Sequence, residues 1–298
     1  MACLKKITKL VLMIIWIASY PKSGNTWVRS LLTSYYFSNI DSRFPDLNKI
    51  PNFNVGDFIN NSNLLKNNID VAAHWIKVQN QIKKKYNKTF FFKTHNACIS
   101  INNNNFTNSD NTRGCIYVLR DPRNVITSYK NFESKSYEEI LKHITNKEAF
   151  LYSNKKFEDN FGFKGFEFIS SWSSNYNSWV NNNLNIPVCL VRYEDLIKDT
   201  IHELERMVGF IAKIQNVKDF KFDINKGTNA VNNSDFKNLS NMENQNDLNI
   251  FPQELKKKNK KFFNLGKKNE WSKLLPQSIK DSIEKNFEID MKALGYIR

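Results

Sequence analysis

The chain has 298 residues, of which 41% are hydrophobic, and a net charge of +15 from 44 Lys and Arg against 29 Asp and Glu. This length can bury a sizeable core and suits one large α/β domain or two small ones. The charge favours an anionic partner, either a polyanion, an anionic membrane or an anionic small ligand. Because the lysines occur in short scattered runs, we interpret most of them as a solvated surface and expect no nucleic acid partner.

The cysteine spacing and the N-terminal segment argue against several further classes of protein. The four cysteines stand far apart without a CxxC pair or a Cys/His cluster, which argues against zinc and against a disulfide framework. Lysines followed by an apolar run resemble a signal peptide. However, the run has about nine residues and leads directly into the loop at residue 19, so cleavage would remove the predicted central strand. No run reaches the roughly 18 apolar residues of a membrane span. We therefore expect a cytoplasmic protein with reduced thiols and no transmembrane segment.

The segment over residues 12–32 organises the rest of the chain. An apolar run over residues 12–18 leads into a loop over residues 19–27, and a helical pattern follows through Val28, Leu31 and Leu32. A helix N-terminus after such a loop attracts anions. The Walker pattern is absent, because the loop lacks the spaced second Gly and the Lys-Ser/Thr ending. The segment therefore predicts a P-loop-like phosphate cradle, with an ordinary strand-to-helix turn as the alternative.

The next part of the chain is predicted to contain a lid or connection, a helix and a strand. Residues 37–68 are loop-rich and form either a substrate-side lid or a long connection. A helix is expected over residues 71–86. A short buried strand over residues 89–95 ends on two titratable side chains, Lys93 and His95.

The middle of the chain repeats this alternation of strand and helix. The Asn-rich stretch over residues 101–113 is predicted to be an exposed loop. A third buried strand over residues 115–119 ends on Arg120, and Asp121-Pro122 marks the start of a helix. Residues 150–168 are aromatic and weakly patterned, as in a mobile lid. The elements expected after this lid are a helix over residues 169–183, a strand over 188–193, a helix over 200–211, loop around a short helix over 225–250, and a last helix over 276–294.

Continuous apolar strands that alternate with helices predict a three-layer α/β fold, with a central parallel sheet and helices on both faces. We expect one domain over residues 1–298. Ligands of such sheets bind at the carboxyl ends of the strands. Five polar side chains follow predicted strand ends: Lys22, Lys93, His95, Arg120 and Tyr193. We expect them to meet on one rim, at the carboxyl ends of the strands.

This rim suggests the chemistry of the site. It would hold three cations, one histidine, hydroxyls and the aromatic rings of Trp27 and Tyr193. No carboxylate cluster marks a Mg²⁺ site, because Asp121 and the pair Glu194 and Asp195 can instead cap helices or pair with arginines, so no metal is expected. Cations without a metal suggest transfer of a group that carries less charge than phosphate, and a sulfuryl group fits.

Five segments carry a resemblance to a known family. They are residues 20–27 (Tyr-Pro-Lys-Ser-Gly-Asn-Thr-Trp), residues 92–95 (Phe-Lys-Thr-His), Arg120 with Ser128 eight residues later, residues 191–196 (Val-Arg-Tyr-Glu-Asp-Leu), and residues 262–271. In this order they resemble the motifs of the PAPS-dependent sulfotransferases of the cytosolic type. The resemblance covers nearly the whole chain.

The resemblance implies a role for each matching residue. For the co-substrate PAPS, Ser23, Gly24, Asn25 and Thr26 would bind the 5′-phosphosulfate, Arg120 and Ser128 the 3′-phosphate, and Trp27, Tyr193 and Phe236 the adenine side, while Gly266 and Lys267 belong to the closing loop. His95 would be the general base on the acceptor. Lys22 and Lys93 would stabilise the charge that develops during transfer.

Two positions depart from the family pattern. The closing loop usually carries Arg-Lys just before its Gly, where this chain has Asn264 and Leu265, and Lys267 and Lys268 are the available substitutes. Asn25 stands where Thr is common, and its amide can donate to a phosphate oxygen.

The acceptor stays open between a small molecule, a lipid and a glycan with a hydroxyl or amine. The alternatives are a P-loop-like small-molecule kinase, a basic nucleic-acid-binding protein and a catalytically weak or silent family member. The oligomeric state is also open, with a homodimer as one alternative.

Overall fold

The computed structural model describes residues 13–38, 45–59, 65–85, 89–133, 135–151, 166–244, 261, 263 and 265–298. Within these residues four strands form a parallel sheet in the order β2-β1-β5-β8. The strands are β1 (Ile14–Ser19), β2 (Phe90–Thr94), β5 (Thr112–Leu119) and β8 (Val188–Arg192). All six residues of β1 are buried, as expected for a central strand that is covered on both faces.

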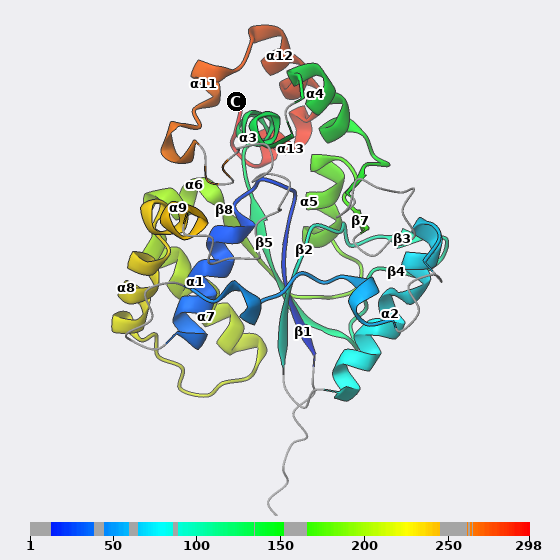
Figure 1. Ribbon diagram of the computed structural model, residues 1–298, viewed down its shortest axis with the longest axis vertical. Helices are drawn as coiled ribbons and strands as arrows, with labels where there is room; N and C mark the ends of the chain where they lie inside the picture. Colours follow the sequence, from blue (N-terminus) through cyan, green and yellow to red (C-terminus); the bar gives the residue numbers. More distant parts are fainter. Residues whose placement is uncertain are drawn as a thin grey trace, which may run out of the picture.

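The two faces of the sheet pack against different helices (Figure 1). Ile14, Trp16 and Ala18 belong to one apolar cluster, whereas Ile15 and Ile17 belong to the other, because successive side chains of a strand point to opposite faces. The first cluster includes residues of α2 (Asn68–Lys85), α3 (Pro122–Glu133) and α5 (Trp172–Val180), and the second includes residues of α1 (Asn25–Phe37), α7 (Thr200–Ile214) and α8 (Ile224–Asn233). The expectation of a three-layer α/β fold is confirmed.

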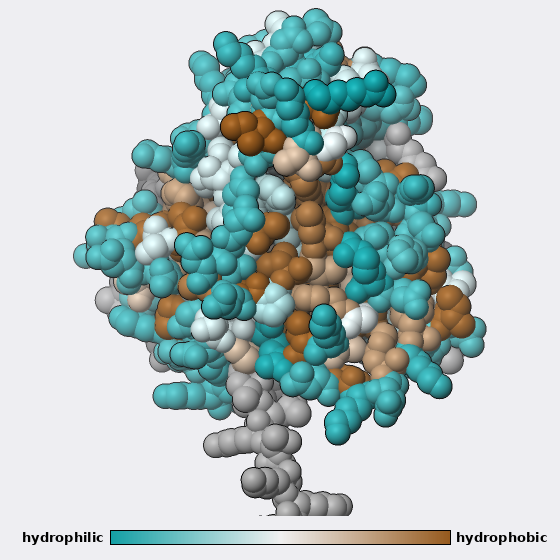
Figure 2. Space-filling model, turned by 180° about the vertical axis from the view of Figure 1, so that it is seen from behind, coloured by the Kyte–Doolittle hydropathy of each residue, from teal (hydrophilic) through white to brown (hydrophobic). Residues whose placement is uncertain are grey.

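The remaining elements are short. Beyond the carboxyl ends of the strands, at the top of Figure 1, lie α4 (Tyr137–Thr145), α11 (Trp271–Leu274), α12 (Gln277–Asn286) and α13 (Glu288–Ala293). The others are α6 (Tyr193–Lys198), α9 (Phe236–Asn244), the 3₁₀ turns η1 (Leu47–Lys49), η2 (Val55–Asp57) and η4 (Gly266–Lys268), and two hairpins, β3 (Ser100–Ile101) with β4 (Asn104–Asn105) and β6 (Phe150–Leu151) with β7 (Glu167–Phe168). None of the described helices has the length and apolarity that a bilayer crossing requires. The face in Figure 2 is hydrophilic around its rim, with hydrophobic side chains gathered toward the middle.

The prediction of an exposed loop over residues 101–113 was right only in part, since residues 102, 103, 105, 109 and 110 are exposed and others are paired or buried. Residues 100–105 form the hairpin of β3 and β4, and Phe106 and Thr107 are fully buried. The Phe106 ring packs on Trp16, with 5.1 Å between ring centroids. Gln79 donates to the Phe106 carbonyl (2.6 Å) and accepts from the Thr107 hydroxyl (2.7 Å). This polar segment can be buried because its hydrogen bonds are satisfied inside the core.

Two helical regions at the C-terminal side also differ from the prediction. The polar stretch after residue 224 contains two helices, α8 and α9, in place of one. Asp223 caps α8 by accepting from the backbone N–H groups of Asn225 and Lys226, a stabilisation that does not depend on apolar periodicity. The last helix is divided into α12 and α13 at Phe287, whose side chain is buried.

The two segments that the sequence suggested as lids are described in part. Residues 45–59 pack along the outer edge of β2, where the Lys93 N–H donates to the Pro51 carbonyl (2.8 Å) and the Phe53 N–H donates to the Lys93 carbonyl (2.8 Å). This part covers a sheet edge, which favours the interpretation of the segment as a connection and not as a lid. In the second segment the described ends pair as β6 and β7. Residues 39–44, 60–64 and 152–165 lie outside the described residues.

Candidate active site

A cavity of about 540 Å³ lies at the carboxyl ends of the strands. Its walls come from the loop after β1, the ends of β2, β5 and β8, helix α3, and the segment around α9 and η4. The predicted site residues that line it are Lys22, Gly24, Asn25, Thr26, Trp27, Lys93, His95, Arg120, Ser128, Tyr193, Phe236 and Gly266. Ser23 is buried and is not among the lining residues, and the Lys267 side chain and all of Asn264 lie outside the described part of the chain.

The loop after β1 requires glycine at position 24. Gly24 has a φ of 102°, in the left-handed region, and a Cβ at this position would stand 2.5 Å from Cδ2 of Tyr193. Helix α1 begins at the next residue without a side-chain cap on its N-terminus. The first N–H groups of a helix have no partner within it, so this end of α1 presents donors and a positive dipole end to the cavity.

Asn25 is used differently from the expectation. Its side-chain amide donates to the Ile17 carbonyl (3.0 Å) and to the Ser19 hydroxyl (3.2 Å), both in β1. The amide has two N–H donors, and both are therefore engaged within the protein. This amide therefore has no free N–H donor for a phosphate oxygen.

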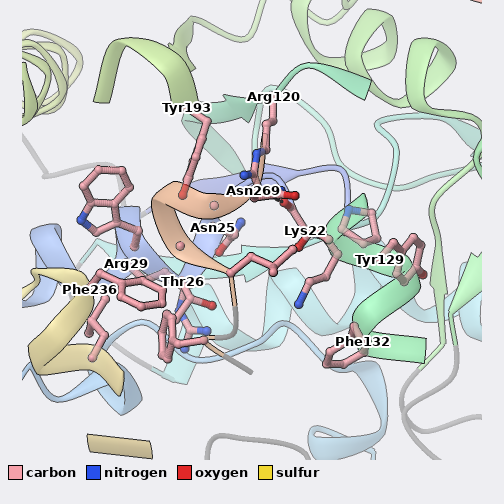
Figure 3. Close-up of a pocket in the computed structure, with 18 of the residues that line it drawn as sticks. Lys22, Asn25, Thr26, Arg29, Arg120, Tyr129, Phe132, Tyr193, Phe236 and Asn269 are labelled. Carbon is pink, nitrogen blue, oxygen red and sulfur yellow. Dashed lines mark hydrogen bonds between the residues drawn. The ribbon is translucent and has the colours of Figure 1, made fainter. Parts of the chain in front are cut away.

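The ammonium group of Lys22 has a lowered pKa. Burial and the nearby charge of Arg120 lower the pKa of Lys22 to about 7, while Glu133 and Glu243 act in the opposite direction. Its Nζ lies 4.1 Å from the centroid of the Phe132 ring, and Figure 3 shows the two side chains on the same side of the cavity.

The His95 imidazole is oriented by the strand next to it. Nδ1 of His95 lies 2.7 Å from the carbonyl oxygen of Ser19, an acceptor, so Nδ1 carries the proton and Nε2 has a lone pair. Burial and the charge of Lys93 lower the pKa of His95 to about 3, with a lesser contribution from Lys22, while Glu167 and Ser19 act in the opposite direction. The ring is therefore neutral at pH 7.

Glu167 is a site residue that sequence reasoning missed. Its carboxylate accepts from Nζ of Lys93 (3.2 Å), from the His95 backbone N–H (2.6 Å) and from the Thr94 hydroxyl (3.3 Å). Burial raises the pKa of Glu167, but Lys93 and His95 outweigh it and the pKa is lowered overall. Glu167 lies in an aromatic stretch more than 70 residues from its partners, and no local pattern marks it.

Arg120 and Tyr193 form a stacked pair, visible in the upper part of Figure 3. The guanidinium carbon lies 4.0 Å from the Tyr193 ring centroid, and Nη1 donates to the Lys22 carbonyl (3.1 Å). Burial lowers the pKa of Arg120, and its Nε has no hydrogen-bond partner among the described residues. The acids that could have neutralised it are engaged elsewhere, since Asp121 pairs with Arg123 (2.6 Å) and Glu194 accepts from the Asp121 N–H (3.0 Å).

The closing loop is anchored by another residue that the sequence did not reveal. Asn269 is buried, accepts from the Thr127 hydroxyl (2.6 Å) and donates to the Asn124 carbonyl (2.9 Å), which ties the loop to α3. Gly266 has a φ of 51°, and a Cβ there would stand 2.9 Å from the Phe236 ring. This contact places Phe236 beside the cavity (Figure 3).

The site can bind an anionic ligand and remove a proton. Cations and an uncapped helix N-terminus surround one cavity with a neutral imidazole and aromatic rings. Among the described residues, no group of three or more His, Cys, Asp or Glu could hold a metal ion.

Comparison with known proteins confirms the resemblance to sulfotransferases. A family model described as the sulfotransferase domain matches residues 14–295. Luciferin sulfotransferase of Photinus pyralis is 23% identical over 236 residues, which are 74% of this chain and 58% of that protein, so this chain spans less than two thirds of that relative. Flavonol 3-sulfotransferase of Flaveria bidentis is 24% identical over 291 residues, 95% of this chain and 83% of that protein.

Solved structures share the fold of this chain. Mouse sulfotransferase SULT7A1 in complex with PAP has a TM-score of 0.57 at 13% identity, covering 94% of this chain and 84% of that one. Retinol dehydratase in complex with androsterone and PAP has a TM-score of 0.55 at 14% identity, covering 95% of this chain and 82% of that one. Since the family model covers nearly the whole chain, this protein belongs to the sulfotransferase family.

Proposed function

We propose that this protein transfers a sulfuryl group from PAPS to a hydroxyl or amine of a small-molecule, lipid or glycan acceptor. The family supports the type of reaction, and the similar structures contain PAP, the product that PAPS leaves behind. The positions of the side chains around the cavity support the assignment of individual roles.

The donor would lie between the loop after β1 and the closing loop. Its 5′-phosphosulfate would accept from the N–H groups at the N-terminus of α1, and its 3′-phosphate would bind Arg120 and Ser128. The adenine would bind among the aromatic rings of Trp27, Tyr193 and Phe236.

In the transfer step the acceptor oxygen or nitrogen forms a bond to sulfur while the bond from sulfur to the bridging phosphate oxygen breaks. The acceptor proton goes to Nε2 of His95, and adenosine 3′,5′-bisphosphate (PAP) leaves with the electron pair of the broken bond. Lys22 and Lys93 would stabilise the charge that develops on the bridging and sulfuryl oxygens.

The observation that carries this proposal is the orientation of His95 in the anion-binding cavity. Its Nδ1 proton is held by the Ser19 carbonyl, which leaves Nε2 as the proton acceptor. With a pKa of about 3, the His95 imidazole is a weak base in the free enzyme. The negative charges of bound PAPS would counter Lys22 and Lys93 and raise the pKa of His95, so that the base gains strength when the donor is present.

Thermal stabilisation by PAP in the presence of EDTA tests the donor, because a ligand that binds the folded state raises its stability. We expect PAP to raise the melting temperature, and transfer of label from PAPS across an acceptor panel to follow. Stabilisation by ATP with Mg²⁺ alone would refute the proposal and favour a small-molecule kinase. Salt-sensitive binding to duplex DNA without a nucleotide effect would refute it in favour of a nucleic-acid-binding protein.

A further inference from the structure

Arg29 is a buried cation in the cavity that the roles above do not use. It lies on α1, lines the cavity and is 5% exposed. Its Nη2 donates to the Leu47 carbonyl (3.1 Å), and its Nε has no hydrogen-bond partner among the described residues. Burial lowers the pKa of Arg29 to about 10, so the guanidinium is still charged at neutral pH.

The charge of Arg29 is not balanced by an acid in the part of the chain that the structure describes. Among the described residues no Asp or Glu forms an ion pair with it, in contrast to Arg123, which contacts Asp121 and Glu284 at 2.6 Å each. A buried cation without a counter-ion is costly. A guanidinium with spare donors that faces a cavity can recover this cost by binding an anion, and its planar fork suits two oxygens at once.

Arg29 lies between the start of α1 and the catalytic end of β2. Side chains on a helix lean toward its N-terminus, so Arg29 extends past Thr26 on the same face of α1, and Figure 3 shows the two near each other. Burial lowers the pKa of Lys93, Glu167 raises it, and the charge of Arg29 lowers it further, so Arg29 is electrostatically coupled to Lys93. Asn52, which also lines the cavity, pairs with Lys93 through a β-bridge.

Around the end of β2, the described side chains carry more positive than negative charge. Arg29 and Lys93 stand against one carboxylate, Glu167, which is already bonded to Lys93. The anionic groups of the donor already have Lys22, Lys93 and Arg120 in the proposed arrangement, which leaves Arg29 as the cation without an assigned anion. Elsewhere in the same cavity, Tyr129, Phe132 and Leu151 offer apolar contacts, with Phe132 beside Lys22.

We propose that Arg29 binds an anionic oxygen group of the acceptor, so that the acceptor is an acidic compound with an apolar body and a separate hydroxyl or amine. The inference rests on the proposed function and narrows its acceptor class. Arg29 would then act as a specificity-determining residue, since it selects the acceptor without taking part in proton or sulfuryl transfer.

The test measures acceptor binding to the full-length protein saturated with PAP, by titration calorimetry. The probes are 4-hydroxyphenylacetate and its methyl ester, which share the ring and hydroxyl and differ in the charge. The variants are Arg29→Gln and Arg29→Met, the second serving if the first fails to fold. Lys77→Gln on the outer, exposed part of α2 is the matched control for loss of one positive charge.

We expect the wild type and Lys77→Gln to bind the acid at least tenfold more tightly than the ester. Replacement of Arg29 should abolish this preference, leaving ester and PAP affinities within about threefold of the wild type. Equal affinities for acid and ester in the wild type, no binding of either, or a preference that survives in the Arg29 variants would overturn the inference. Weaker PAP binding in these variants would assign Arg29 to the donor and also overturn it. Failure of the wild type to bind PAP would instead defeat the proposed function itself.

Discussion

Replacing Glu167 with Gln tests whether a buried acid holds the catalytic end of β2 together. The substitution keeps a side-chain oxygen for the His95 N–H and the Thr94 hydroxyl but removes the negative charge beside Lys93. The two side chains are 10% and 15% exposed, so solvent screens the pair weakly. Removing one partner of a buried pair typically costs about 3–5 kcal/mol, because the other charge is left uncompensated. At about 2 °C per kcal/mol, the melting temperature should fall by about 6–10 °C.

The pH dependence gives a second measurement with a definite sign. The pKa of Glu167 is lowered in the folded protein, so this group stabilises the fold above its unfolded pKa of about 4.5, and the contribution disappears as the pH falls through the lower folded pKa. The stability difference between wild type and Glu167→Gln should therefore be full at pH 7 and shrink below about pH 4.5.

The assay is denaturant unfolding of wild type, Glu167→Gln, Lys93→Met and the double variant. A coupling energy of about 1 kcal/mol or more between the two positions is expected, since adjacent charged partners are not additive. A cost below about 1 kcal/mol for Glu167→Gln, with a coupling energy near zero, would show that the pair does not stabilise this corner and would refute the reasoning. Tyr193→Phe, whose ring contact with Arg120 is retained, serves as a control for a mild change near the cavity.

Three further predictions concern the reaction. His95→Ala should keep PAP affinity and lose about 10²–10⁴-fold in turnover, and wild-type turnover would remove His95 from the mechanism. Gly24→Ala should weaken PAP binding at least tenfold in calorimetry, because a Cβ would stand 2.5 Å from Tyr193 at a φ of 102°; unchanged affinity would contradict this. Saturating PAP should raise the NMR-measured pKa of His95 above about 3, whereas a lower or constant value would contradict the charge argument.

The amino-acid sequence alone predicted the sheet and the loop around which the cavity forms. The strands of a sheet covered on both faces are continuous apolar runs, and those of β1, β2, β5 and β8 could be recognised without knowledge of their neighbours. The residues after these runs had to meet at one edge because parallel strands end on the same side. For this reason Lys22, His95 and Arg120 could be placed at one cavity in advance.

Tertiary structure decided which partner each side chain has. Glu167 meets Lys93 and His95, and Asn269 meets Thr127, across long stretches of chain, and no local periodicity encodes such contacts. The sequence likewise suggested a phosphate donor in the Asn25 amide, which the fold turns toward β1. The charge of Arg29 is visible in the sequence, but its burial follows only from how α1 packs against the segment around Leu47.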